Sequence, residues 1–332
     1  MTAITVGVIG ATGNTGQTVV NGLLSSPAAF TITSFTRESS VNSQENQRLK
    51  AKGVSIVGYD LSGPRQKLVD QLENIDVLIS CITWEHLNLQ LPWIEAAKDA
   101  GVKRFVPSEW VGPCPKGVHW IKDHKLEILG AIQRARLPYT IIDVGCWYSV
   151  FVPKVPSGRS DKAHMRYIDH RIVEDGNQKF ALTDIADIGK YVAQIVADPR
   201  TINKHVFAYT EVLSMNEIWD TMARVTGEEP VKNYVSLSEI YEIIKTCRKR
   251  LENSAHGMMH ADNIMDCANY NMGEYRISWC VRGDNTPEYA EYLGYLDFWK
   301  MFPDFQKGTS LESFFRSVVG GEIGSTMYDP DQ

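Results

Sequence analysis

Three glycines near the N-terminus, Gly10, Gly13 and Gly16, have the spacing of a turn that holds phosphate groups. The first glycine allows a sharp bend, the second lets the backbone approach a pyrophosphate, and the third lets a helix pack closely on a strand. The N–H groups and positive dipole at the start of the following helix attract the phosphates. The sequence therefore predicts a dinucleotide-binding turn. Its expected contacts come from Gly10, Thr12, Gly13, Asn14, Thr15 and Gly16.

Arg37 indicates which dinucleotide this turn would bind. It follows the next predicted strand, where an acidic residue would bind the ribose hydroxyl of NAD and an arginine would accommodate the 2′-phosphate of NADP. Arg37 offers a planar fork of donors that matches a phosphate, and Ser39 adds a hydroxyl. Two alternatives stay open, because Glu38 could serve a ribose and Arg37 could be a solvated charge. We expect NADP(H) as the cofactor.

Lys125 is the candidate for acid–base chemistry, because it stands in the apolar stripe of a helix predicted over residues 118–136. A lysine in such a stripe either extends its ammonium to the surface or is partly desolvated in a cleft. Desolvation would lower the pKa of the ammonium and make it a usable proton donor near neutral pH. The residues alone leave both alternatives open. The stripe consists of Ile121, Ile128, Leu129 and Ile132.

Other candidates lie where predicted strands end, because ligands bind outside the carboxyl ends of parallel strands. Ile82 and Thr83 follow one such strand and are expected near the cofactor, with packing as the alternative. Aromatic side chains at the ends of two later strands would wall a pocket for a flat ring, and plain core packing is their alternative. The candidates for the substrate pocket are Trp110, Trp147, Tyr148 and Phe151.

Strands and helices that alternate along the chain must position these residues. This alternation implies right-handed crossovers and a parallel sheet with helices on both faces. The predicted fold class is α/β, a Rossmann-type doubly wound parallel sheet with a smaller, mainly helical substrate domain. Strands are predicted at 4–9, 31–35, 54–59, 77–81, 104–107, 140–144 and 205–209, and helices at 65–72, 88–100, 118–136 and 183–197.

The predicted first domain covers residues 1–150 and is completed by 179–209, while 151–178 and 210–332 form the second. Residues 153–176 are polar and turn-rich, which is consistent with an excursion or a lid. His256 and His260 are four residues apart, but no cysteine or zinc motif is near, so no metal is expected. Helices of the second domain are predicted at 215–225, 237–251, 288–300 and 311–319, with a Met-, His-, Asn- and Trp-rich stretch at 255–284.

Composition limits the classes of function. Hydrophobic residues make up 43% of the chain and charged residues 22%, as in ordinary globular proteins. A net charge of −6 argues against nucleic acid as a partner, and no apolar run resembles a membrane span or a signal peptide. The six cysteines are scattered without C-x-x-C pairs, which favours reduced thiols in the cytoplasm. The expected partner is a small molecule. The sequence does not decide the oligomeric state, and a homo-oligomer is one of the alternatives.

These residues together resemble the NmrA-like, isoflavone-reductase-like branch of the atypical short-chain dehydrogenases/reductases, and its fungal members in particular. The resemblance runs through most of the chain, and the combination of motifs is more specific than any one of them. Besides the glycine motif, it rests on the segments 36–39 (TRES), 58–61 (GYDL), 75–80 (IDVLIS), 100–109 (AGVKRFVPSE), 137–140 (LPYT), 282–287 (RGDNTP) and 293–296 (LGYL).

The resemblance implies an NADP(H)-binding Rossmann domain with a smaller, mostly helical substrate domain. In reductases of this family a lysine on the helix before the LPYT-like strand is catalytic, and Lys125 has that position, next to the bound cofactor. Trp147 has the position of an aromatic residue beside the nicotinamide. The Tyr-x-x-x-Lys pair of ordinary short-chain dehydrogenases is absent, because Ile121 stands four residues before Lys125.

We therefore expect an NADPH-dependent reductase of a small aromatic or heterocyclic secondary metabolite. Hydride would go to a C=C, C=O or C=N group, with Lys125 as the acid. Two other functions are compatible with the same residues. One is an NADP-binding redox sensor without catalysis, and the other is a condensing or cyclising enzyme that retains NADP without redox chemistry.

Overall fold

The structure is a computed structural model that describes residues 3–165, 168–256 and 260–323. The chain divides into two compact units, each assembled from segments that are distant in sequence. Unit 1 comprises Met1–Trp110, His124–Asp143 and Ile185–Ala208, and unit 2 comprises Val111–Asp123, Val144–Asp184 and Tyr209–Gln332. Among the described residues, no helix is both long enough and apolar enough to cross a membrane.

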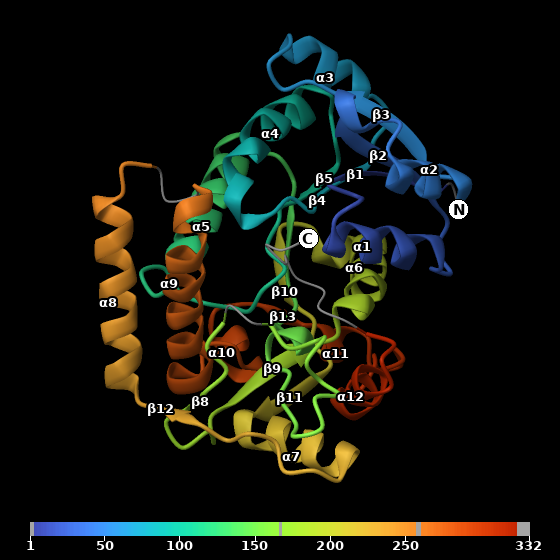
Figure 1. Cartoon of the computed structure of the whole chain (residues 1–332). Helices are drawn as coiled ribbons and strands as arrows, with labels where there is room; N and C mark the ends of the chain where they lie inside the picture. The colour runs from blue at the N-terminus through green and yellow to red at the C-terminus, as the bar shows by residue number, and fades with distance from the viewer. Residues whose placement is uncertain (1–2, 166–167, 257–259, 324–332) are drawn as a thin grey trace. The chain divides into compact units, whose positions relative to one another are not determined.

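Unit 1 is built on parallel strands. They are β1 (Ile4–Ile9), β2 (Phe30–Arg37), β3 (Ser55–Tyr59), β4 (Val77–Ser80), β5 (Arg104–Val106), β6 (Thr140–Asp143) and β10 (Lys204–Phe207). The first five form one sheet in the order β3-β2-β1-β4-β5 (Figure 1). A bridge between Phe105 and Tyr139 continues it to β6, which pairs in parallel with β10. Every residue of β4 is buried, which explains why its sequence is continuously apolar up to Ser80.

Helices follow these strands, as the alternation of the sequence predicts. They are α1 (Asn14–Leu24), α2 (Gln44–Ala51), α3 (Arg65–Gln71), α4 (Gln90–Asp99), α6 (Ile188–Ala197) and α5 (Trp120–Arg134), whose first turn belongs to unit 2. α1 and α6 lie side by side in unit 1 (Figure 1). The parallel sheet with its helices confirms the predicted Rossmann-type α/β class.

Unit 2 combines helices with two small sheets. Its strands are β7 (Cys146–Trp147), β8 (Ile172–Val173), β9 (Lys179–Thr183), β11 (Glu211–Ser214), β12 (Tyr234–Val235) and β13 (Leu296–Asp297). Its helices are α7 (Met215–Thr226), α8 (Leu237–Asn253), α9 (Ile264–Ile277), α10 (Pro287–Tyr292), α11 (Phe298–Met301) and α12 (Leu311–Val319). β9 pairs in parallel with β7 and antiparallel with β11, and β8 pairs in parallel with β12.

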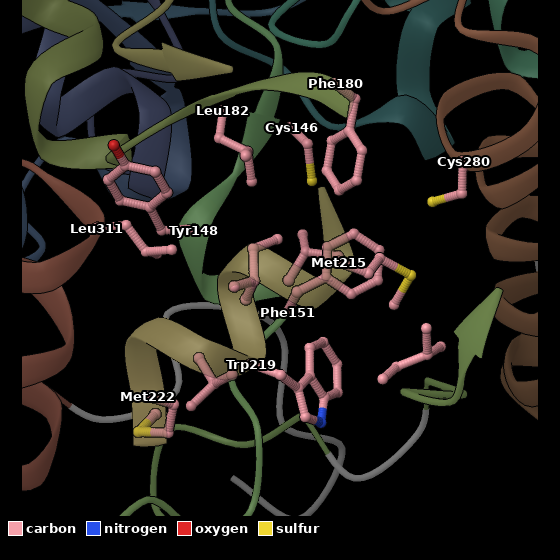
Figure 2. Close-up of a cluster of buried hydrophobic side chains, with 14 of the residues drawn as sticks. Cys146, Tyr148, Phe151, Phe180, Leu182, Met215, Trp219, Met222, Cys280 and Leu311 are labelled. Atoms are coloured by element: carbon pink, nitrogen blue, oxygen red, sulfur yellow. The ribbon is translucent and has the colours of Figure 1, made fainter. Parts of the chain in front are cut away.

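The core of unit 2 gathers around α7 and β9. Figure 2 shows Phe151, Phe180 and Trp219 among its buried side chains, and each is at most 2% exposed. Val155 and Ala163 join the same cluster. Part of the turn-rich segment predicted as an excursion or a lid is therefore anchored in this core.

The boundary between the units differs from the predicted domain boundary at residues 111–123, 144–150, 179–184 and 209, which the sequence analysis places in the first domain. The backbone N–H groups of Val144 and Gly145 both donate to the carbonyl oxygen of Val111, at 2.7 and 3.1 Å. β9 pairs with β7, which lies just beyond Gly145. These hydrogen bonds join the segments 111–123, 144–150 and 179–184 to one another within unit 2.

The helix predicted over residues 288–300 is wrong, because the structure has two shorter helices there, α10 and α11, separated by β13. Gly294 has φ of +85°, a left-handed conformation that ends a helix. Asp297 then caps α11, since its carboxylate accepts a hydrogen bond from the backbone N–H of Lys300 at 3.0 Å. The helical spacing of apolar residues continues through residues 288–300, whereas the helical conformation of the backbone is interrupted.

α9 lies in the stretch 255–284, where the sequence predicts no helix. It lies beside α8 (Figure 1), and a Cβ atom on Gly273 would come within 2.6 Å of Ile244 Cγ1. Asn271 and Arg276, two of its polar residues, are buried. Buried polar side chains on α9 disturb the apolar periodicity by which a helix is recognised in a sequence.

Candidate active site

The glycine turn has a backbone path that only glycine allows at two of its positions. Gly10 has φ of +76°, and a Cβ atom there would lie 2.8 Å from the carbonyl oxygen of Cys81. A Cβ atom on Gly16 would lie 2.0 Å from the carbonyl oxygen of Gly10. The turn closes with a hydrogen bond from the Gly13 N–H to the Gly10 carbonyl oxygen at 3.1 Å. The predicted roles of the first and third glycines in bending and packing follow directly from these contacts.

The N-terminus of α1 suits an anionic ligand. Gly13 is its N-cap residue and has no side chain to accept hydrogen bonds from the first turn, and no acidic residue stands in that turn. The positive end of the helix dipole therefore meets neither an acidic side chain nor a side-chain cap. A pyrophosphate fits this arrangement. Of the other predicted contacts, Thr12 is half-buried, Asn14 is exposed and Thr15 is buried.

Arg37 is the last residue of β2 and Ser39 lies two residues further on; both are exposed, where the sequence predicts the contacts to a 2′-phosphate. Asn46 on α2 holds this segment, because its side-chain amide donates to Thr36 Oγ1 at 3.2 Å and to the carbonyl oxygen of Ser40 at 2.7 Å. Asn46 is 1% exposed. The sequence does not point to it, because it stands in a helix whose other residues are mostly polar or charged.

The segments after β4 and β5 are hydrogen-bonded to each other. Ser108 donates its hydroxyl to the carbonyl oxygen of Ile82 at 2.7 Å and its N–H to Gln90 Oε1 at 2.9 Å. Gln90 is 1% exposed and is a second residue that the sequence does not reveal. Thr83 is exposed, and its hydroxyl donates to Glu85 at 3.0 Å. Ile82 is thus held at the carboxyl edge of the sheet.

Trp110, the last residue of the first segment of unit 1, has an unusual backbone conformation with φ of +49°. A non-glycine residue in this region is uncommon and costs on the order of 1 kcal/mol. Its indole N–H donates to the carbonyl oxygen of Ser80, the last residue of β4, at 3.1 Å. Trp110 is 4% exposed, so nearly all of its surface is covered by the protein.

Lys125 is buried on α5, with 6% of its surface exposed, and Ile121 and Ile128 beside it in the stripe are also buried. Its ammonium donates a hydrogen bond to the backbone carbonyl oxygen of Glu109, just beyond β5. Of the two alternatives left open by the sequence, extension to the surface does not occur. The ammonium lies at the carboxyl edge of the sheet in the unit that also carries the glycine turn, Arg37 and Ile82.

Trp147, Tyr148 and Phe151 belong to unit 2. Tyr148 and Phe151 are each 1% exposed and pack in the core cluster, so the structure places them in the packing role that the sequence left as an alternative. The Tyr148 hydroxyl donates to Glu211 at 2.7 Å. Trp147, at the end of β7, is only partly buried. It is the residue of this group whose exposure suits contact with a ligand.

His256 and His260, for which the sequence predicts no metal, lie near Asp262 at the surface of unit 2. The potential ligand atoms of the three residues lie within 4.8 Å of one another. All three side chains are exposed, and such surface clusters are common without an ion. We assign no role to this cluster.

Comparison with known proteins gives consistent matches. Residues 2–298 match the NmrA-like family. Asnovolin J 5′,6′-dehydrogenase of Aspergillus novofumigatus (strain IBT 16806) is 42% identical over 327 residues, which cover 98% of each chain. Phenylcoumaran benzylic ether reductase TP7 of Nicotiana tabacum is 32% identical over 250 residues, which cover 72% of this chain and 80% of the relative.

Two solved structures have the same fold. AtPrR2 with NADP⁺ and (+)-pinoresinol has a TM-score of 0.76 and 22% identity, covering 96% of this chain and 99% of the other. The ternary complex of leucoanthocyanidin reductase from Vitis vinifera has a TM-score of 0.74 and 21% identity, covering 95% and 99%.

Proposed function

The chain belongs to the NmrA-like family, and we propose that it is an NADPH-dependent reductase of a small aromatic or heterocyclic secondary metabolite. The observation that carries this proposal is the buried Lys125 ammonium at the carboxyl edge of the sheet, in the same unit as the glycine turn. Support comes from the relatives, which include a fungal dehydrogenase and a plant reductase. All six cysteines are buried and none of them forms a disulfide, which supports a cytoplasmic location.

The glycine turn and Arg37 would hold NADP(H), with the pyrophosphate at the start of α1 and the 2′-phosphate on the guanidinium. NADPH, when bound, supplies the hydride. Lys125 holds a proton on Nζ and donates it to the substrate atom on which negative charge develops. The hydrogen bond to the Glu109 carbonyl oxygen orients the ammonium, and the apolar stripe beside it limits the access of water. Trp147 is the aromatic residue that we assign to the substrate.

The Arg37→Ala variant tests the cofactor assignment. Loss of a charge-assisted pair with phosphate is expected to weaken NADPH binding about tenfold to a hundredfold, with little change for NADH. Calorimetric titration with NADPH, NADP⁺, NADH and NAD⁺ measures this. Arg134→Ala, at an exposed position on α5, is the control for loss of a positive charge. Equal affinity of the wild-type protein for NADPH and NADH would contradict the assignment and point to Glu38 as a ribose ligand.

Reductase activity itself is tested with a panel of aromatic and heterocyclic compounds that carry an activated C=C, C=O or C=N group. We expect the absorbance of NADPH to fall by one equivalent for each product molecule formed. With both C4 hydrogens of the dihydronicotinamide replaced by deuterium, one deuterium should appear in each product molecule. Product formed without consumption of NADPH would overturn the proposal in favour of a condensing or cyclising enzyme.

A further inference from the structure

Two neighbouring residues at the end of β2, Arg37 and Glu38, would act in opposite directions on a dinucleotide. A guanidinium at this place favours a 2′-phosphate, whereas a carboxylate favours a ribose 2′-hydroxyl and repels a phosphate. A protein that uses NADPH therefore has to keep the carboxylate of Glu38 away from the ribose. The structure shows which group binds the Glu38 carboxylate.

Glu38 forms an ion pair with Lys67 on α3, with 3.0 Å between Glu38 Oε1 and Lys67 Nζ. Its carboxylate lies directly against Gly58 of β3. A Cβ atom on Gly58 would come within 3.1 Å of Glu38 Oε2 and 3.2 Å of its Cδ. The side chain of Glu38 is therefore directed across β3 towards α3, over a position where glycine leaves room for it.

Charges around the pair fit this arrangement. Hydrogen bonds from Ser62 lower the pKa of Asp60, and the positive charge of Lys67 lowers it further. The ammonium of Lys67 therefore acts on two carboxylates, those of Glu38 and Asp60. Arg37 acts on a different neighbour: burial raises the pKa of the Tyr59 hydroxyl, and the charge of Arg37 opposes that rise. Arg37 and Glu38, adjacent in sequence, thus have separate partners.

We propose that Lys67 sets the preference for NADPH over NADH by holding Glu38 away from the ribose. The inference rests on the cofactor assignment in the proposed function. Lys67 is a positioning residue, because it acts through Glu38 and not on the dinucleotide itself. Without Lys67, the carboxylate of Glu38 becomes free to accept a hydrogen bond from a ribose hydroxyl and to repel a 2′-phosphate. Both side chains are about half exposed, so the effect is modest and weakens with salt.

A double-mutant cycle with Lys67→Met and Glu38→Gln tests the proposal. Dissociation constants of NADPH and NADH are measured by calorimetry for the wild type, both single variants and the double variant. We expect Lys67→Met to lower the preference for NADPH about threefold to tenfold at low salt, and less at high salt. In the Glu38→Gln background the same change should alter the preference by less than about twofold, because the residue through which Lys67 acts is already neutral.

Each other outcome overturns the proposal. If Lys67→Met lowers NADPH affinity as much in the Glu38→Gln background as in the wild-type background, Lys67 contacts the phosphate directly. A fall in melting temperature with equal loss of affinity for both dinucleotides would mean a purely structural role. Lys98→Met, at an exposed position on α4, controls for the loss of one positive charge and should leave the preference unchanged. The test needs no substrate, so it can succeed even where the proposed reduction fails, whereas a wild type without preference for NADPH refutes the cofactor assignment as well.

Discussion

Replacing Lys125 by alanine is expected to lower turnover by about two to four orders of magnitude, the usual contribution of a positioned proton donor. The ammonium is the group of Lys125 that can donate a proton, and it is held by the carbonyl oxygen of Glu109. The contacts proposed for the phosphates come from other residues, so the affinity for NADPH should change little. Steady-state turnover at saturating substrate, together with calorimetric titration of NADPH, measures both quantities.

Two further variants separate the possible roles of the Lys125 ammonium. Lys125→Met keeps an unbranched side chain in the apolar stripe and should lower turnover as much as alanine does, with better packing. Lys125→Arg keeps the positive charge but holds its proton too tightly to donate it near neutral pH. Turnover that is largely retained in the arginine variant would show that charge alone is required. Turnover unchanged in both alanine and methionine variants would remove Lys125 from the mechanism.

The spacing of apolar residues predicts those strands and helices that bury one regular apolar face. β1 and α12 have the predicted bounds, 4–9 and 311–319, because a buried strand and an amphipathic helix each have a characteristic spacing of apolar residues. α9 is missed because polar residues such as Arg276 are buried within it. The helix predicted at 288–300 fails because Gly294 is treated as part of a periodic pattern, whereas its backbone is left-handed.

The same distinction applies to the candidate site. The glycine turn can be recognised in the sequence because its residues are close neighbours in the chain. Lys125 stands out by its place in an apolar stripe, but its predicted role as the acid comes from the family resemblance. Asn46 and Gln90 cannot be recognised in the sequence, because their amides act on segments 6 to 18 residues away in sequence. Lys67 lies 29 residues from Glu38, and nothing in either local sequence indicates that they pair. Residues that position a site through such contacts become visible only once the chain is folded.

Replacing Gly189 by alanine is expected to destabilise unit 1 by about 3 kcal/mol or more and to lower its melting temperature by about 5 °C or more. A Cβ atom on Gly189 would lie 1.7 Å from the carbonyl oxygen of Thr18 in α1. That atom belongs to the backbone of a helix and cannot move as a side chain would, so α1 and α6 have to separate. Thermal unfolding followed by circular dichroism measures the change.

Gly130→Ala on α5 is the matched control, because a Cβ atom there meets only the end of the Arg134 side chain, at 3.2 Å. Alanine has the higher helix propensity, so this variant should be as stable as the wild type or more so. A Gly189→Ala variant with the same melting temperature as the Gly130→Ala control would contradict the close crossing of α1 and α6.

The crossing matters for the site because glycine contacts fix α1 at both of its ends. Gly16 approaches the carbonyl oxygen of Gly10 in the turn, and Gly22 approaches the backbone of Gly189 in α6, with 2.0 Å between a Cβ atom on Gly22 and the Gly189 carbonyl carbon. Displacement of α1 at the α6 crossing would therefore also shift the helix N-terminus proposed to bind the pyrophosphate. We expect Gly189→Ala to weaken NADPH binding even at temperatures where the variant stays folded, although Gly189 lies outside the glycine turn.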